Sequence, residues 1–206
     1  MLQNDMTRLS LNLFKDRLSL NPNPPAPPPD MQLAGVLAPL FFSKDEPHLL
    51  FTQRTMTVRD HRGQISFPGG VHSSQDADLL ATALREAREE IGLDPEQVEV
   101  LGGINPVATV TGYWITAFVG LIPYPYDFHL NSGEVERLLL LPLEGFCDPR
   151  RWNSGEYTYQ GRMVRVCCWK HGGTVIWGAT ARLLLDLLQR LGENVFPGDQ
   201  DVPCVD

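Results

Sequence analysis

The sequence lacks several features that direct a chain to particular partners or compartments. It contains no apolar run of roughly 18 residues, so we expect no transmembrane helix, and its N-terminus lacks the long apolar core of a secretory signal. Basic blocks are also absent and the net charge is −8, so neither a constitutive nucleic-acid partner nor a membrane partner is expected. A cytoplasmic location follows as the default expectation.

Cysteine is scarce as well. The four cysteines are Cys147, Cys167, Cys168 and Cys204, and none has the spacing of zinc ligands. Cys167 and Cys168 are adjacent on an expected strand, so their side chains should point to opposite faces. Structural zinc is therefore not expected, and reduced, partly buried thiols are the interpretation that suits a cytosolic protein.

The length of 206 residues is enough for one main domain with a substantial core. Residues 1–20 are expected to form a short amphipathic helix, over about 7–20, that packs on the domain or on a second subunit. Residues 21–30 are rich in proline and predict an extended linker, with a ligand for a proline-recognition domain as the alternative. Residues 31–206 form the main domain in this interpretation.

Apolar patterning after residue 31 alternates between strands and helices. Two amphipathic helices are predicted, over residues 77–91 and 179–191, and residues 123–133 are expected to be a loop. Strands are predicted at residues 32–42, 48–53, 64–67, 98–104 and 113–122, and a hairpin at 156–161 and 163–170. Residues 134–141 lead to Pro142-Leu143, where a short helix is expected. Strands interleaved with two main helices predict the α/β fold class.

The helix predicted over residues 77–91 has an apolar stripe and a flank of carboxylates. At about 100° per residue, the apolar side chains fall within a narrow arc. They are Leu80, Ala83, Leu84, Ala87 and Ile91. Ser73, Ser74 and Asp76 are the candidates for the N-cap, and Gly92 stands where a left-handed C-cap is wanted.

Three glutamates on this helix are candidates for a metal site. Glu86 and Glu90 are stacked neighbours at i and i+4, and Glu89 lies about a quarter turn further round. Carboxylates held this close repel one another unless a divalent cation lies among them, which favours Mg²⁺ or Mn²⁺. Arg85 points elsewhere and is better placed to orient a carboxylate than to bind metal. The alternative is a solvated helix face, the usual interpretation of an isolated run of charges.

Residues 70–93 resemble the Nudix box. That motif reads Gly, five residues, Glu, seven residues, Arg-Glu, an aliphatic, any residue, Glu-Glu, any residue, Gly and an aliphatic. Its second half matches Arg85-Glu86-Ala87-Arg88-Glu89-Glu90-Ile91-Gly92-Leu93, with the small Ala87 at an aliphatic position. The first half departs, because Asp76 stands in place of Glu and eight residues separate it from Arg85. The resemblance implies the Nudix α/β/α sandwich with a mixed β-sheet, formed by residues 31–206.

A second motif precedes the box and narrows the resemblance. This motif consists of Thr52-Gln53-Arg54-Thr55, Arg59, Gly63 and Phe67-Pro68-Gly69-Gly70. It resembles the signature that precedes the box in coenzyme A pyrophosphatases of the Nudix superfamily. Thr55 departs from this signature, in which Ser or Ala is usual at that position. A Nudix box that is longer by one residue is itself common among coenzyme A pyrophosphatases. The likeness spans about residues 33–192, includes Val110-Thr111-Gly112-Tyr113 and Trp177-Gly178-Ala179-Thr180-Ala181, and is greatest to the bacterial NudL-type subgroup.

The resemblance implies a metal-dependent pyrophosphohydrolase that cleaves the diphosphate of coenzyme A and its thioesters. The products would be 4′-phosphopantetheine and adenosine 3′,5′-bisphosphate. A broader nucleoside-diphosphate-X hydrolase, acting on NADH, ADP-ribose or capped RNA ends, is the alternative within the enzyme class. Outside the enzyme class, two hypotheses stay open: a non-catalytic Nudix-fold binding module, and an interaction protein that uses the proline segment. A homodimer is a further expectation, and it rests only on the frequency of dimers in the superfamily.

The same resemblance suggests the catalytic and metal-binding residues. Glu86 and Glu90 would be the principal ligands of Mg²⁺ or Mn²⁺, and Glu89 would join them directly or through water and take part in catalysis. Arg85 would orient the carboxylates. Glu134 follows a loop that could fold over the site, and a glutamate from such a loop is the candidate general base.

Four further residues are candidates for binding substrate. Gly69 and Gly70 would let the backbone approach metal or phosphate closely, with a simple tight turn as the alternative. Arg54 and Arg59 belong to the second motif, and their charges would suit the extra 3′-phosphate of coenzyme A.

Overall fold

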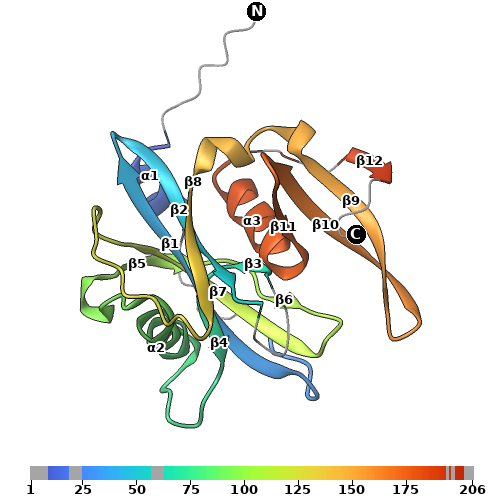
Figure 1. The fold of residues 1–206 in the computed structure, drawn as a ribbon, viewed down its shortest axis with the longest axis horizontal. Helices are drawn as coiled ribbons and strands as arrows, with labels where there is room; N and C mark the ends of the chain where they lie inside the picture. Colours follow the sequence, from blue (N-terminus) through green and yellow to red (C-terminus); the bar gives the residue numbers. More distant parts are fainter. Residues whose placement is uncertain (1–8, 19–24, 57–62, 194, 196–197, 202–206) are drawn as a thin grey trace, which may run out of the picture.

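The computed structural model describes residues 9–18, 25–56, 63–193, 195 and 198–201, and within them a mixed sheet of eight strands forms the centre of the fold (Figure 1). The strands are β1 (Gln32–Ser43), β2 (Glu46–Arg54), β3 (Ile65–Ser66), β4 (Gly69–Val71), β5 (Glu99–Gly103), β6 (Val107–Ala108), β7 (Tyr113–Leu121) and β8 (Val135–Pro142). The order is β3-β2-β1-β7-β5, with β8 on β2, β4 on β1 and β6 on β7. Strands β1 and β7 are parallel and the other pairs are antiparallel, so the predicted mixed sheet is confirmed.

A second sheet of four strands stands beside the first in the described part of the chain (Figure 1). It consists of β9 (Trp152–Tyr159), β10 (Arg162–His171), β11 (Thr174–Trp177) and β12 (Gly198–Asp201), in the order β11-β10-β9-β12. The predicted hairpin is confirmed. Its two turn residues, Gln160 and Gly161, have φ of 48° and 75°, the left-handed pair that a two-residue hairpin favours. Its first strand begins earlier than predicted, at Trp152, and β11 and β12 were not predicted.

Three α-helices lie among the described residues: α1 (Leu11–Arg17), α2 (Leu79–Ile91) and α3 (Gly178–Arg190). Short 3₁₀ helices are η1 (Pro95–Gln97), η2 (Leu143–Phe146) and η3 (Pro149–Arg151). Helices α2 and α3 agree with the predicted ranges to within two residues, and η2 is the short helix expected near Pro142. Helix α1 is shorter than the range predicted from residue 7 to residue 20, both ends of which lie outside the described residues.

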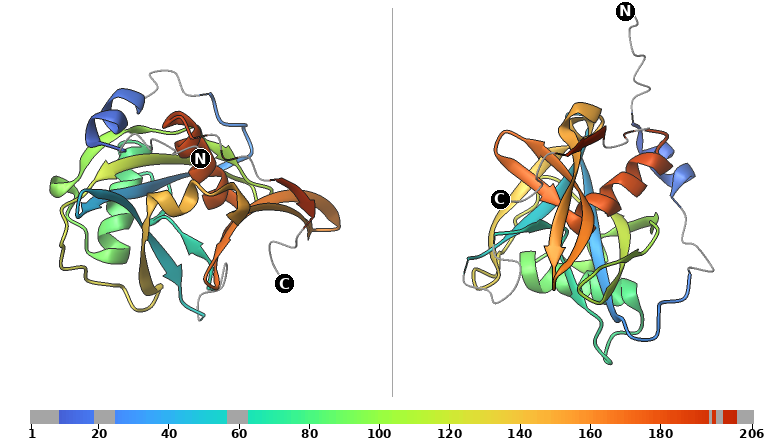
Figure 2. Two further views of the ribbon diagram at one scale, coloured as in Figure 1. Left: turned by 90° about the horizontal axis from the view of Figure 1, so that it is seen from above. Right: turned by 90° about the vertical axis from the view of Figure 1, so that its right-hand side faces the viewer.

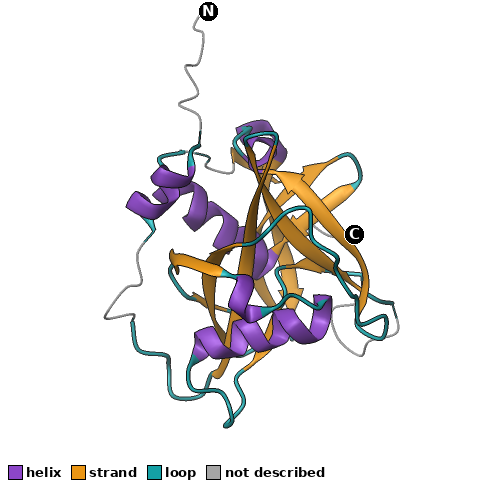
Figure 3. Ribbon diagram, turned by 90° about the vertical axis from the view of Figure 1, so that its left-hand side faces the viewer, coloured by secondary structure: helices purple, strands orange, loops and turns teal. Residues whose placement is uncertain are grey.

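Helices cover both faces of the main sheet, which makes the architecture an α/β/α sandwich (Figures 2 and 3). Strand β1 shows the division, because successive side chains of a strand point to opposite faces. Leu37 and Phe41 pack in the core beneath α2, whereas Ala38 and Leu40 pack in the larger core that α1 and α3 cover. The α/β fold class inferred from the sequence is therefore confirmed.

Helix α1 packs on the domain itself. Phe14 is fully buried in the larger core and Leu18 is almost so, and the Phe14 ring meets Phe42 edge to face at 6.3 Å. Nζ of Lys15 lies 2.7 Å from the carboxylate of Glu99 on β5. This helix was expected to pack either on the domain or on a second subunit, and in the structure it packs on the domain.

The structure also bears on the expectations about membrane-spanning helices and about cysteines. No helix in the described ranges is long and apolar enough to cross a membrane. Cys147 and Cys167 are free thiols, but Cys168 is disulfide-bonded, so the expectation of reduced cysteines is wrong for Cys168. Cys204 lies outside the described residues.

Candidate active site

Helix α2 begins and ends at residues that fix its position under the sheet. Asp78 is the N-cap, and its carboxylate accepts a hydrogen bond of 2.8 Å from the Ala81 amide. The expectation of Ser73, Ser74 or Asp76 is therefore wrong. Gly92 has φ of 69° and forms the left-handed C-cap, as predicted.

The two glycines before the helix are part of a strand and not of a free turn. Strand β4 pairs with β1, so that Gly69 lies opposite Val36 and Gly70 opposite Gly35. A Cβ atom at Gly70 would lie 2.5 Å from the Glu86 carboxylate, which means that this carboxylate rests directly against the β4 backbone. The absence of a side chain at residue 70 thus makes room for a charged group of α2.

Arg85 holds a group of three carboxylates together. It donates from Nε and Nη2 to Asp76 at 2.9 and 3.1 Å, and from Nη1 to Glu86 at 2.8 Å and Glu89 at 3.0 Å. The hydrogen bonds from Arg85, followed by one from the Ser73 amide, hold the pKa of Asp76 well below its usual range. Asp76 is thus engaged by Arg85, which explains why it does not cap α2. Through these hydrogen bonds Arg85 orients the carboxylates of Asp76, Glu86 and Glu89.

Glu90 is buried beside these groups. Its side chain is 6% exposed, and desolvation by burial raises its pKa to about 8, although the charge of Arg54 opposes the shift. Nη1 of Arg54 is 4.0 Å from Oε1 of Glu90. Oε2 of Glu90 is buried and has no hydrogen-bond partner among the described residues. An unsatisfied carboxylate oxygen at this place fits a hard divalent cation.

Glu86 and Glu89 differ from Glu90 in exposure. The side chain of Glu86 is 18% exposed, and burial raises its pKa while Arg85 lowers it, whereas the side chain of Glu89 is 57% exposed. Within the described ranges, no group of three or more His, Cys, Asp or Glu side chains is arranged to hold a metal ion by itself. A cation bound at Glu86 and Glu90 would therefore take its other ligands from water and phosphate oxygens, as Mg²⁺ commonly does.

Glu134 is brought to the same place by the loop that precedes β8. The Asn131 amide donates to the Glu90 carbonyl at 2.9 Å, and the Asn131 side chain donates to Oε1 of Glu134 at 3.2 Å. The Thr55 amide donates to the Glu134 carbonyl at 2.9 Å. Repulsion from Glu134 contributes to the raised pKa of both Glu86 and Glu90, so the three carboxylates are electrostatic neighbours.

The structure thus brings together most of the residues singled out in the sequence. The residues that come together lie along the C-terminal half of α2 and on the segments beside it, and they are Glu86, Glu89, Glu90, Arg85, Glu134, Arg54, Gly69 and Gly70. Arg59 lies outside the described residues. Asn131 was missed by sequence reasoning. The run Asn131-Ser132-Gly133 is typical of a turn whose asparagine bonds its own backbone, and the Gly133 amide does donate to the Asn131 side chain at 3.2 Å.

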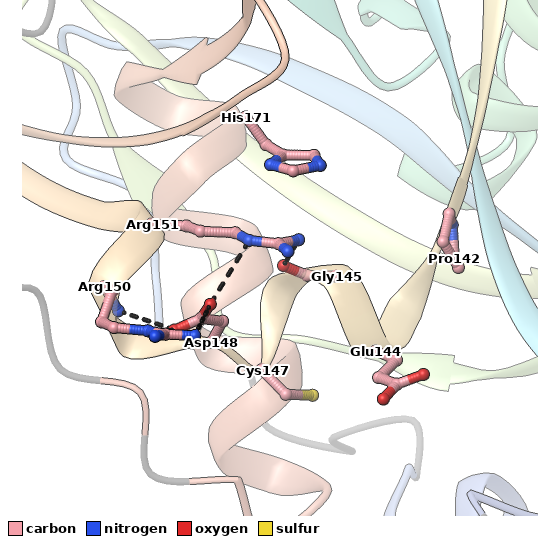
Figure 4. Close-up of a pocket in the computed structure, with 8 residues that line it drawn as sticks. All are labelled: Pro142, Glu144, Gly145, Cys147, Asp148, Arg150, Arg151 and His171. Carbon is pink, nitrogen blue, oxygen red and sulfur yellow. Dashed lines mark hydrogen bonds and ion pairs between the residues drawn. The ribbon is translucent and has the colours of Figure 1, made fainter.

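A surface pocket of about 540 Å³ opens elsewhere, around η2 and η3 (Figure 4). It lies at the Pro142 end of β8, roughly 20 Å from the Val135 end by the rise of a strand. Arg150 and Arg151 both face Asp148 there, with Nε–oxygen distances of 2.9 and 3.5 Å. Asp148 contacts both arginines and Glu144 also lines the pocket, so two carboxylates balance the two positive charges and the pocket lacks the excess positive charge that an anionic ligand needs.

Comparison with known proteins gives a consistent result for most of the chain. The sequence profile of the NUDIX domain matches residues 31–158. The chain is 36% identical, over 189 residues, to a protein described as an uncharacterized Nudix hydrolase NudL from Salmonella newport (strain SL254), covering 91% of this chain and 98% of that protein. A NudL protein from Photorhabdus laumondii is 35% identical over 189 residues, or 89% of this chain and 98% of that protein.

Solved structures match a smaller part. A Nudix hydrolase from M. smegmatis, RenU, has a TM-score of 0.47 and 21% identity, covering 55% of this chain and 71% of that one. An Ap4A hydrolase from C. elegans has a TM-score of 0.46 and 20% identity, covering 54% of this chain and 80% of that one.

Proposed function

Because the chain belongs to the Nudix hydrolase family, whose members hydrolyse pyrophosphate bonds, we propose that its substrate is coenzyme A or a coenzyme A thioester. Hydrolysis of the diphosphate then gives adenosine 3′,5′-bisphosphate together with 4′-phosphopantetheine, or with its S-acyl derivative when the substrate is a thioester. The motif that includes Arg54, Arg59, Gly63 and residues 67–70 supports this choice over NADH, ADP-ribose and capped RNA ends. Arg54 lies at the carboxylate cluster, where a phosphate of the substrate would be bound.

The environment of Glu90 supports the metal-dependent part of the proposal. Its carboxylate is buried, one of its oxygens has no partner among the described residues, and Glu86 lies beside it against the Gly70 backbone. When bound, Mg²⁺ or Mn²⁺ neutralises phosphate charge, activates water and holds the leaving phosphate. Glu86 and Glu90 hold the cation in this account, and Arg85 keeps Glu86 and Glu89 oriented through its two hydrogen bonds to them.

Glu134 is the general base of the proposal. It is exposed at the end of a loop that is hydrogen-bonded to α2, and it lies near enough to Glu86 and Glu90 to raise their pKa. A carboxylate in this position can accept a proton from the attacking water. Asn131 holds it there by donating to Oε1.

A substrate panel tests the proposal. The protein is incubated with coenzyme A, acetyl-coenzyme A, NADH, ADP-ribose or capped RNA, with Mg²⁺, with Mn²⁺ or with a chelator, and the products are separated by chromatography. We expect metal-dependent release of adenosine 3′,5′-bisphosphate from both coenzyme A compounds. Cleavage of another compound with coenzyme A left intact would refute the substrate but keep the metal site. No turnover of any compound would favour a binding module.

A further inference from the structure

Arg54, a member of the second motif, lies beside the candidate metal ligand Glu90. It is the last residue of β2, and its backbone amide donates to the Gln64 carbonyl at 3.0 Å. The side chain is 29% exposed and reaches toward Glu90 on α2. One guanidinium is therefore within reach of both a buried carboxylate and a ligand arriving from solvent.

The contact between Arg54 and Glu90 is incomplete, unlike the contact between Arg85 and Asp76. Arg85 meets Asp76 through two hydrogen bonds of 2.9 and 3.1 Å, whereas Nη1 of Arg54 stays 4.0 Å from Glu90. Nε of Arg54 and Oε2 of Glu90 are both buried and have no hydrogen-bond partner among the described residues. Buried polar atoms without partners are costly, so each group would be stabilised by a further ligand of opposite charge.

We propose that Arg54 alternates between two anions: it neutralises Glu90 in the metal-free protein, and it binds the substrate diphosphate when a divalent cation neutralises Glu90 instead. This inference rests on the proposed metal site, but it requires only that the substrate carry a diphosphate. Arg54 is then a substrate ligand whose availability depends on the state of Glu90.

The charges favour this exchange. A divalent cation on Glu90 would lie close to the Arg54 guanidinium, and like charges at such a distance repel each other. Diphosphate oxygens offer the guanidinium the bidentate contact that Glu90 does not provide. Cation and diphosphate should therefore strengthen each other's binding, by the same factor in both directions.

The first test needs neither metal nor turnover. Binding of methylenediphosphonate, a diphosphate with a carbon bridge, is measured by calorimetry in a chelator at pH 8.5, above the pKa of about 8 of Glu90, for wild type, Glu90→Gln, Arg54→Gln and the double variant. We expect Glu90→Gln to bind it at least about fivefold more tightly than wild type, because Arg54 is released. The gain should vanish in the Arg54→Gln background. No gain, or a gain of equal size in both backgrounds, would overturn the proposal.

The second test measures Mn²⁺ affinity by electron paramagnetic resonance of the free ion, at pH 8.5 under argon and without substrate. Arg54→Gln should bind Mn²⁺ about tenfold more tightly than wild type, since a neighbouring positive charge is lost. The matched control Arg54→Lys keeps that charge and should stay within about threefold of wild type. Weaker binding by Arg54→Gln would contradict the proposal, because Arg54 would then be ordering Glu90 for the metal.

Failure of this inference can be told apart from failure of the proposed function. If Glu90→Gln bound Mn²⁺ as tightly as wild type, the metal site and the proposed function would both be wrong. If only the coupling between Arg54 and Glu90 were absent in the diphosphonate measurement, the metal site would stand and the inference about Arg54 would fall.

Discussion

At the scale of single residues, Glu90 has an environment poorly suited to its charge. It is almost completely buried, and burial raises its pKa to about 8. Arg54 compensates it only partly, from 4.0 Å. A carboxylate so poorly solvated is typical of a functional site, because packing alone would favour an apolar residue there.

The raised pKa of Glu90 predicts how stability depends on pH in the metal-free protein. The folded-state pKa of about 8 lies above 4.5, the ordinary value of a glutamate. The folded state therefore binds more protons between these two pH values, and the free energy of unfolding falls as pH rises through them. Melting temperatures measured in a chelator should decline from pH 5 to pH 9 in wild type and decline less in Glu90→Gln. Parallel curves for the two proteins would contradict the assignment.

Asp76 gives a second prediction for a single residue. It accepts two hydrogen bonds from Arg85, which in turn orients Glu86 and Glu89. Asp76→Asn should lower kcat/KM at least about tenfold, because small misplacements of reacting groups are costly. The matched control is Asp148→Asn, which weakens arginine contacts around η3 and should leave kcat/KM within about twofold. Equal losses in both variants would point to a general effect on folding.

The sequence allowed some of these residues to be predicted and not others. The spacing of Glu86 and Glu90 on a helix can be read directly, since i and i+4 are neighbours on any helix. The N-cap could not be chosen among several polar residues, because Asp76 is engaged by Arg85 and this leaves Asp78 to cap α2. Such a choice depends on contacts that the linear pattern does not contain.

At the scale of elements, the loop before β8 is what carries Glu134 to α2. Glu134→Gln should lower kcat about a hundredfold, the usual effect of losing a general base, while Mn²⁺ affinity stays within about threefold. Glu136→Gln is the matched control, because Glu136 is exposed on β8 two residues further on. Full activity of Glu134→Gln, measured in stopped assays over a range of pH, would remove Glu134 from the mechanism.

Helix α1 supports a prediction about stability. Phe14 is fully buried against the larger core, so Phe14→Ala should lower the free energy of unfolding by about 3–5 kcal/mol. Lys15→Ala, which removes the ion pair with Glu99 on the surface, should cost only about 0–1 kcal/mol. Denaturant unfolding of both variants checks this. Similar small losses for both would mean that α1 detaches from the domain in solution.

Long elements were easier to predict than short ones. Helices α2 and α3 each have 13 residues, enough for the 3.6-residue period to show. Strands β4 and β11 have three and four residues, too few for a two-residue period, and β4 contains the two glycines for which a tight turn was the alternative interpretation. Short strands of this kind are fixed by their partners and not by their own pattern.

At the scale of the whole molecule, the site depends on contacts between distant parts of the chain. Arg54 comes from β2, Gly70 from β4, Glu90 from α2 and Glu134 from the loop before β8. The apolar pattern predicts the α/β class, but the sandwich itself came from the resemblance to the Nudix family. Pattern alone could not give it, because the parallel pairing of β1 with β7 joins residues about 80 positions apart.

The most direct test of the account is the dependence of coenzyme A hydrolysis on Mn²⁺ concentration in wild type, Glu90→Gln and Glu96→Gln. Glu96 is an exposed glutamate on η1 and serves as the matched control. We expect wild type and Glu96→Gln to release adenosine 3′,5′-bisphosphate with the same Mn²⁺ dependence, and Glu90→Gln to lose at least about a hundredfold in kcat/KM. Undiminished, metal-dependent hydrolysis by Glu90→Gln would contradict the claim that the buried carboxylate of Glu90 holds the catalytic cation.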